Sequence, residues 1–179
     1  MPDVDSIMWP RPEGEEEIVY LEGDEGYGPY RSLVREYSEE YGIPENIARA
    51  MMETESTYRP DAYNERSKAR GLYQITPIAA RDVGEDYEEM FDPETNIRTA
   101  MKYLRKMFDR FGGDEDPEVA VSAFNWGPTS TANKPWEDRP KETKDYWDKI
   151  RLNMFKYQKP DSNLPGMWMG GPVGRTRYR

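Results

Sequence analysis

The chain has 179 residues, with 25 basic against 35 acidic side chains and a formal net charge of −10 at pH 7. It contains neither histidine nor cysteine, which excludes disulfides, thiolate nucleophiles, Ser-His-Asp and Cys-His mechanisms and most transition-metal sites. Catalysis would have to use carboxylates, lysine, tyrosine, hydroxyl or backbone groups. No apolar run approaches the roughly 20 residues that span a bilayer, so we expect no membrane span. The acidic start does not resemble a secretory signal peptide.

The distribution of charge divides the sequence into three segments. Residues 1–27 hold nine acidic side chains and one basic one and are interpreted as an acidic N-terminal extension. Residues 28–157 carry the regular apolar patterns and form the predicted folded domain. Residues 158–179 are rich in glycine and proline, include three arginines among the last five residues, and are interpreted as a basic C-terminal tail.

Apolar side chains recur with helical spacing in five stretches of the domain. Two Asp-Pro-Glu triplets place a capping residue before a proline in the first helical turn, and Gly42 and Gly112 provide stop signals. The predicted helices run from Pro29 to Tyr41, from Pro44 onward, from Asp92 to Phe111, from Asp116 to Phe124 and from about Pro140. We find no convincing strand longer than a few residues, and residues 57–76 and 127–139 are predicted loops. The expected class is mostly α.

One residue interrupts the apolar face of the second predicted helix. The stripe through Ile47 and Met51 continues to Glu55, so a carboxylate takes a position where a core residue is expected. A half-buried acid loses hydration in its charged form, which raises its pKa and allows it to act as a general acid near neutral pH. Glu53 is expected on the opposite face, toward water. The alternative for Glu55 is a helix-end acid paired with a lysine or arginine.

Five short blocks accompany Glu55 in a fixed order. They are Glu55-Ser56, Gly-Leu-Tyr-Gln at 71–74, Asp-Pro-Glu-Thr-Asn-Ile at 92–97, Ala-Phe-Asn-Trp-Gly-Pro at 123–128, and Glu142-Thr143 with Tyr146. Together, over roughly residues 30–150, they resemble the soluble lytic transglycosylase family of the lysozyme-like superfamily. The resemblance implies a lysozyme-like helical domain that cleaves the β-1,4 bond between N-acetylmuramic acid and N-acetylglucosamine in peptidoglycan. It also implies a 1,6-anhydro product, one catalytic glutamate, and no metal or organic cofactor.

The same resemblance assigns roles to individual residues. Glu55 is the expected catalytic acid, and the expected substrate-binding residues are Ser56, Asn64, Tyr73, Gln74, Asn125 and Tyr146. The resemblance implies that the Tyr146 hydroxyl reaches the catalytic carboxylate, that Gln74 lines the sugar cleft and that Asn125 faces the glutamate from another helix. Ordinary structural hydrogen bonding or core packing is the alternative for each, and for Ser56 the alternative is a hydroxyl that closes the helix end.

Three positions depart from the family pattern. Phe124 stands where the family usually has tyrosine, Tyr73 replaces a methionine, and Asn64 replaces a serine in a loop that is one residue longer. Asparagine can still donate and accept hydrogen bonds to an acetamido group. Candidates for stacking on sugar rings, of which at least two are expected to be core residues, are Tyr58, Tyr63, Tyr73, Trp126 and Trp136.

Peptidoglycan lies outside the cytoplasmic membrane, and we recognise no export signal. We therefore expect a bacteriophage virion protein that acts in the cell wall and periplasm of the host and opens the wall during genome delivery, or a lysis enzyme released through a holin. The two ends would dock on other tail or internal core proteins, or be solvated. Nucleic acid binding is not expected at this net charge.

Two functional alternatives stay open. One is a structural virion protein that keeps a lysozyme-like scaffold with little activity. The other is a hydrolase of goose-type lysozyme character, for which Asp61 is the nearby acid to consider.

Overall fold

The computed structural model describes residues 26–156. The predicted basic tail, and all but the last two residues of the acidic extension, lie outside the described residues. The α-helices are α1 Arg31–Tyr41, α2 Glu45–Ser56, α3 Pro77–Asp82, α4 Pro93–Phe111, α5 Pro117–Trp126, α6 Pro128–Asn133 and α7 Lys141–Lys156. Short 3-10 turns cover Gly28–Tyr30, Tyr87–Glu89 and Trp136–Asp138. An antiparallel hairpin pairs β1 Tyr63–Asn64 with β2 Ala69–Arg70.

The capping signals identify the two central helices correctly. The Asp92 carboxylate accepts a hydrogen bond from the Thr95 backbone N–H at 2.8 Å, and Asp116 accepts one from the Glu118 N–H at 3.1 Å. Each bond satisfies a backbone donor that has no partner within the first helical turn. Gly112 ends α4 in the left-handed conformation with φ of 70°. The five predicted helices are confirmed as α1, α2, α4, α5 and α7.

The prediction of a loop over residues 127–139 is wrong in part, because α6 occupies its first half. Gly127 ends α5 and at the same time precedes α6, whose first residue is Pro128. The Thr131 hydroxyl donates to the Gly127 carbonyl at 3.0 Å, and its side chain is buried. This short helix consists of small and polar residues and proline, so it shows no apolar periodicity that could predict it. Residues 77–82 likewise form the short helix α3.

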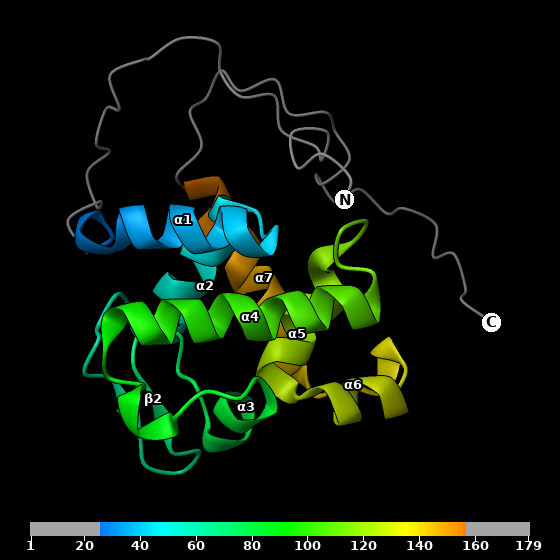
Figure 1. Ribbon diagram of the computed structural model, residues 1–179. Coiled ribbons are helices and arrows are strands. Elements are labelled where there is room, and N and C mark those ends of the chain that lie inside the picture. Colours follow the sequence, from blue (N-terminus) through cyan, green and yellow to red (C-terminus); the bar gives the residue numbers. More distant parts are fainter. Residues whose placement is uncertain (1–25, 157–179) are drawn as a thin grey trace, which may run out of the picture.

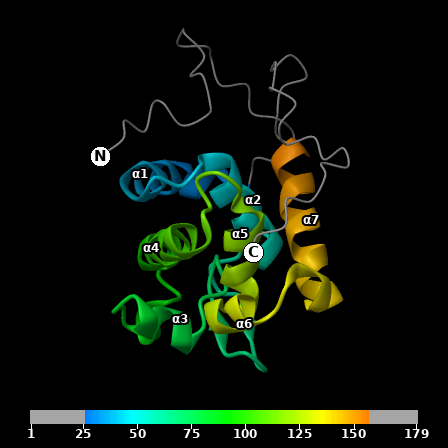
Figure 2. The ribbon, with the colours of Figure 1, turned by 90° about the vertical axis from the view of Figure 1, so that its right-hand side faces the viewer.

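The helices pack in layers around α2 and α5. α4 runs across the molecule, with α1 along one side and α3 along the other (Figure 1). In the view turned by 90°, α1, α4 and α3 form one side, α7 lies on the opposite side, and α2 and α5 lie between them (Figure 2). α2 packs directly against α7, and α5 contacts both α4 and α7. The second predicted helix is therefore in contact with the last one.

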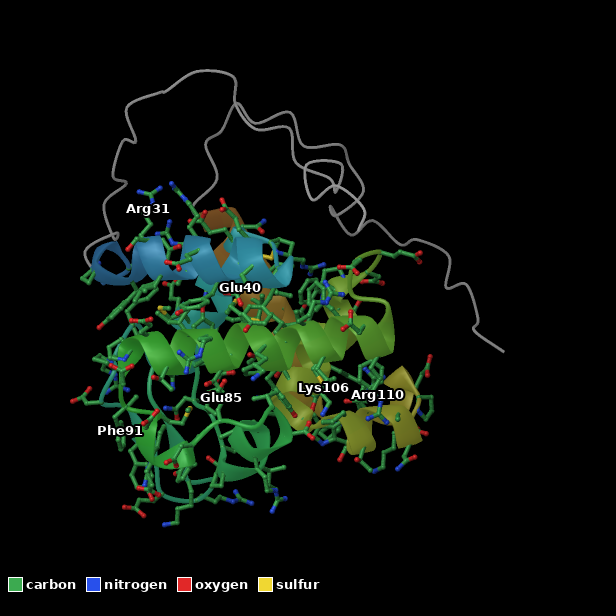
Figure 3. The ribbon with its side chains drawn as sticks, viewed as in Figure 1. Arg31, Glu40, Glu85, Phe91, Lys106 and Arg110 are labelled. Carbon is green, nitrogen blue, oxygen red and sulfur yellow. The ribbon has the colours of Figure 1, made fainter. Side chains whose placement is uncertain are left out.

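A charged cluster holds the segment after α3 on the long helix. Glu85 accepts hydrogen bonds from Arg98 at 3.2 Å and Lys102 at 3.1 Å, and it lies beside α4 in the side-chain view (Figure 3). Partial burial acts to raise the pKa of Glu85, but the two cations outweigh it and hold the pKa below its ordinary value.

Within residues 26–156, no helix combines the length and apolar character that crossing a membrane requires.

A fully buried amide on α4 organises the loop that follows the hairpin. The Asn96 amide donates to the carbonyls of Arg70 at 3.0 Å and Met90 at 2.8 Å, and its oxygen accepts from the Tyr73 N–H at 2.9 Å. A Cβ atom at Gly71, which has φ of 76°, would collide with the Met90 carbonyl and with this amide. We call Asn96 and the backbone groups that it binds the Asn96 hub. The hub fixes the path of residues 70–74.

Candidate active site

A carboxylate and a tyrosine hydroxyl from opposite ends of the domain meet between α2 and α7. The Tyr146 hydroxyl donates to Oε1 of Glu55 at 2.6 Å, across a sequence separation of 91 residues. Glu55 lies in the last turn of α2 and is half-buried, whereas Tyr146 on α7 is 6% exposed. The packing of α7 against α2 creates this contact.

The environment of Glu55 brings the pKa of its carboxyl group close to neutral pH. Burial raises the pKa of Glu55 from 4.5 to about 7, and the hydrogen bond from Tyr146 acts in the opposite direction. Burial and the charge of Glu55 raise the pKa of Tyr146 well above its ordinary value, so this hydroxyl remains a donor. Glu55 therefore exchanges a proton easily near pH 7 while one of its oxygens is held in place.

The segment that carries Glu55 ends in an unusual backbone conformation. Thr57 and Tyr58, which follow α2 directly, have φ of 53° and 61°, a region that residues with a Cβ seldom adopt. The Ser56 hydroxyl accepts a hydrogen bond from the Arg59 N–H at 3.2 Å and donates to the Met52 carbonyl at 3.4 Å. Ser56 is buried, and these contacts match its alternative role of closing the helix end.

The structure places Tyr73 in the core, which corrects its assignment as a substrate-binding residue. Its side chain is fully buried and its hydroxyl donates to the Ala48 carbonyl at 2.9 Å. Because no surface of the ring is open, a sugar cannot stack on it. The next residue, Gln74, is half-buried with φ of 49°, and its amide donates to the carbonyls of Ala62 and Gly71 at 3.1 Å.

The two predicted asparagines are both exposed and belong to different elements, β1 and α5. Asn64 is exposed in the hairpin, where its side-chain oxygen accepts from the backbone N–H groups of Arg66 at 3.0 Å and Ser67 at 3.1 Å. These bonds close the hairpin turn and leave its amide donors available. Asn125 is exposed on α5. Both asparagines are accessible to a ligand, and their substrate roles remain predictions.

Glu53 does not simply face water, contrary to the prediction. It is half-buried and accepts a hydrogen bond from the Tyr58 hydroxyl at 3.4 Å. Tyr58 itself is buried, so together with Tyr73 it accounts for the two expected core aromatics. Tyr63 is 42% exposed, Trp126 is half-buried, and the side chain of Trp136 lies outside the described part of the structure.

Sequence reasoning assigned no role to three residues that support the site. Asn96 belongs to the block at residues 92–97, but its structural role is evident only from the buried carbonyls that its amide binds. Thr54 precedes Glu55, and its hydroxyl accepts a hydrogen bond from the Asn153 amide of α7 at 3.0 Å. Neither Thr54 nor Asn153 departs from the composition of an ordinary helix surface, so no sequence signal marked them.

A second carboxylate does not act on Glu55 within the described residues. Burial and Tyr146 are the causes of its pKa shift, whereas a neighbouring carboxylate would raise it further through charge repulsion. Asp61 is exposed. Burial raises the pKa of Tyr30 at the start of α1, and the charge of Asp61 adds to this rise. Residues 26–156 also contain no cluster of three or more acidic side chains that could hold a metal ion.

The profile of the Transglycosylase SLT domain family matches residues 32–147 of the chain. The chain belongs to this family. Residues of this SLT domain are 36% identical over 124 positions to the membrane-bound lytic murein transglycosylase C of Pectobacterium atrosepticum and 33% identical to that of Serratia proteamaculans. Each alignment covers 62% of this chain and 34% of the relative. The chain thus matches about a third of the length of these relatives.

Two solved structures share the fold of this SLT domain. The lytic transglycosylase Slt of Pseudomonas aeruginosa, solved as an inactive mutant, aligns with a TM-score of 0.61 and 21% identity over 72% of this chain and 24% of its own. The 70 kDa soluble lytic transglycosylase of Escherichia coli aligns with a TM-score of 0.61 and 23% identity over 70% of this chain and 23% of its own. The predicted mostly helical, lysozyme-like class is confirmed.

Proposed function

We propose that this SLT domain is a peptidoglycan lytic transglycosylase that cleaves the bond between N-acetylmuramic acid and N-acetylglucosamine and leaves a 1,6-anhydro end. The observation that carries the proposal is the half-buried Glu55, with a pKa of about 7 and a Tyr146 hydroxyl at 2.6 Å. The family membership and the names of the relatives support the substrate class.

The proposed reaction uses the two protonation states of Glu55 in turn. The protonated carboxyl first donates its proton to the glycosidic oxygen as the bond from that oxygen to C1 of the muramic residue breaks. The 6-hydroxyl of the same residue then bonds to C1 and gives its proton to the Glu55 carboxylate. No water is consumed, and the glutamate returns to its starting state. A group that must both give and take a proton works best when its pKa is close to the working pH.

The arrangement around Glu55 favours this reaction over two-carboxylate hydrolysis. Retaining and inverting glycosidases place two carboxyl groups across the bond that they cleave, whereas Tyr146 is the titratable group that acts on Glu55 in residues 26–156. The Tyr146 hydroxyl stabilises the carboxylate that forms after proton donation. An attacking hydroxyl within the substrate replaces the activated water, with the high effective concentration of an intramolecular reaction.

The test is mass spectrometry of fragments released from purified peptidoglycan. We expect fragments lighter than hydrolytic muropeptides by the mass of one water molecule, and we expect Glu55→Gln to lower their rate of release by roughly 10²- to 10⁴-fold. Glu53→Gln, the same change two residues away on the same helix, is the matched control and should retain activity. Fragments of hydrolytic mass would instead identify a lysozyme-type hydrolase. No fragments from a folded wild-type protein would favour the scaffold alternative.

The setting of this activity in a phage particle stays a prediction. It rests on the composition of segments outside the described residues, and the relatives named above are bacterial proteins. Detection of the chain by mass spectrometry in purified, nuclease-treated phage particles would support the virion setting. Its absence from particles that package DNA normally would contradict it.

A further inference from the structure

Two polar contacts join α7 to the last turn of α2. One is the bond from Tyr146 to Glu55 at 2.6 Å, and the other is the bond from the Asn153 amide to the Thr54 hydroxyl at 3.0 Å. The α7 residues of these pairs are two turns apart, about 10 Å along the helix axis. Their partners on α2 are adjacent residues. One bond would allow α7 to pivot, whereas two bonds with separated anchor points restrict both its position and its rotation.

The second contact has a defined direction. The Thr54 hydroxyl donates its own proton to the Ala50 carbonyl at 2.8 Å, so toward α7 it offers a lone pair. It therefore needs a donor, and the Asn153 amide supplies one. Thr54 and Asn153 are both half-buried, where a matched donor and acceptor are favoured and a mismatch is costly. The pair thus selects one register between the two helices.

Apolar packing alone does not provide this selection. Between the two polar contacts, α7 buries Trp147 and Ile150 against the core. Burial of apolar surface stabilises the docking of α7 but is non-directional, so it tolerates small rotations and shifts. A hydrogen bond between a hydroxyl and a carboxylate weakens steeply with distance and angle. The Tyr146 contact therefore depends on a directional restraint elsewhere on the same helix.

We propose that Asn153 is a positioning residue, which binds Thr54 and thereby fixes α7 so that the Tyr146 hydroxyl meets the Glu55 carboxyl. Asn153 acts through Tyr146 and does not touch the substrate. The catalytic part of the inference rests on the proposed function, whereas the positioning part concerns the folded protein alone.

A double-mutant cycle tests the inference with Asn153→Leu and Tyr146→Phe, singly and combined, in the 179-residue chain. The readout is the titration midpoint of Glu55, followed by NMR with ¹³C-labelled glutamate, which does not require activity. The Tyr146 bond lowers the pKa of Glu55, so Tyr146→Phe raises the midpoint. We expect Asn153→Leu to cause most of the same upward shift in the wild-type background and no further shift when Tyr146 is already phenylalanine.

Two further variants complete the experiment. Thr54→Val removes the same contact from the α2 side with a side chain of similar shape, and it takes the place of Asn153→Leu if that variant does not fold. Leu152→Ala changes a residue of α7 that is 68% exposed and should leave the midpoint unchanged. A wild-type midpoint in Asn153→Leu and Thr54→Val would overturn the proposal. An equal shift in both backgrounds would also overturn it, because Asn153 would then act on Glu55 without Tyr146.

Activity separates this inference from the proposed function. If both hold, Asn153→Leu shifts the pH at which the rate of anhydro-muropeptide release falls, in the same direction as the NMR midpoint. If the NMR cycle gives the expected result but the folded wild-type protein releases no fragments, the positioning role holds and the proposed function fails.

Discussion

The Asn96 hub and the end of α2 differ in how completely their buried polar groups are hydrogen-bonded. In the hub, the amide of a fully buried side chain is matched on both its nitrogen and its oxygen, by two carbonyls and one N–H. At the end of α2, the Glu55 carboxyl has one hydroxyl partner, partial exposure and a displaced pKa, and two residues with positive φ follow it. Complete pairing stabilises the fold, whereas incomplete pairing leaves a group that can react.

The largest change in the free energy of unfolding is expected from a substitution in the Asn96 hub. Asn96→Ala takes the amide partner from the Tyr73 N–H and the Met90 carbonyl, while the Arg70 carbonyl keeps its bond from the Ile75 N–H. We expect a loss of unfolding free energy of about 3–5 kcal/mol. Asn133→Ala, at an exposed asparagine at the end of α6, should stay within about 0.5 kcal/mol of wild type. Urea unfolding followed by circular dichroism measures both. A loss below about 1 kcal/mol for Asn96→Ala would remove the contrast between the two regions.

The second largest effect concerns Glu55, and replacing it should raise the free energy of unfolding instead of lowering it. The reason is that Glu55 destabilises the folded state when it is charged. Its folded pKa of about 7 lies above the ordinary 4.5. Below pH 4.5 the group is protonated in both states and costs nothing. As the pH rises toward 7, the unfolded chain loses the proton more readily, and folding becomes less favourable by up to about 3 kcal/mol.

Glu55→Gln should therefore be more stable than wild type at pH 8. The difference should shrink as the pH falls from 7 to 4.5 and vanish at pH 4. Unfolding free energies measured across this range provide the test, and Glu53→Gln shows how much of the change follows from removing any carboxylate of α2. If the Glu55→Gln variant is less stable than wild type at pH 8, Glu55 is a stabilising group like Asn96.

The smallest effect concerns the backbone after α2. Thr57 is β-branched and has φ of 53°, a conformation that costs about 1–2 kcal/mol for residues with a Cβ. Thr57→Gly relieves this strain but increases the entropy of the unfolded chain, so we expect a net gain of up to about 1 kcal/mol in thermal or urea unfolding. A loss of stability would show that the Thr57 side chain offsets the strain through its own contacts.

The helices could be predicted where a local signal exists. Asp92 and Asp116 predict the starts of α4 and α5, because a capping side chain followed by proline stabilises the first turn of a helix through contacts within that turn. α6 carries no such pattern, since Gly127 is shared between two helices and Thr131 is its one buried residue. Its position depends on packing that sequence periodicity does not express.

The site could be predicted only at its centre. Glu55 stands out because it interrupts an apolar stripe, and the structure confirms that it is half-buried. Burial raises its pKa, as the sequence pattern predicts. Tyr73 lies in a block that resembles the family, at a position where the family has methionine, and its ring is buried with its hydroxyl bonded to the Ala48 carbonyl. Asn153 carries no pattern of its own and became visible only once α7 was seen against α2.

The separation of 91 residues between Glu55 and Tyr146 also has a consequence during synthesis. α2 emerges from the ribosome long before α7, and contacts between distant segments form late because they must close a long loop. Until residue 146 has left the exit tunnel and α7 has docked, Glu55 has no hydroxyl to hold it. A nascent or truncated chain that lacks α7 therefore also lacks the contact on which the proposed reaction depends, and the proposed site is complete only in the finished fold.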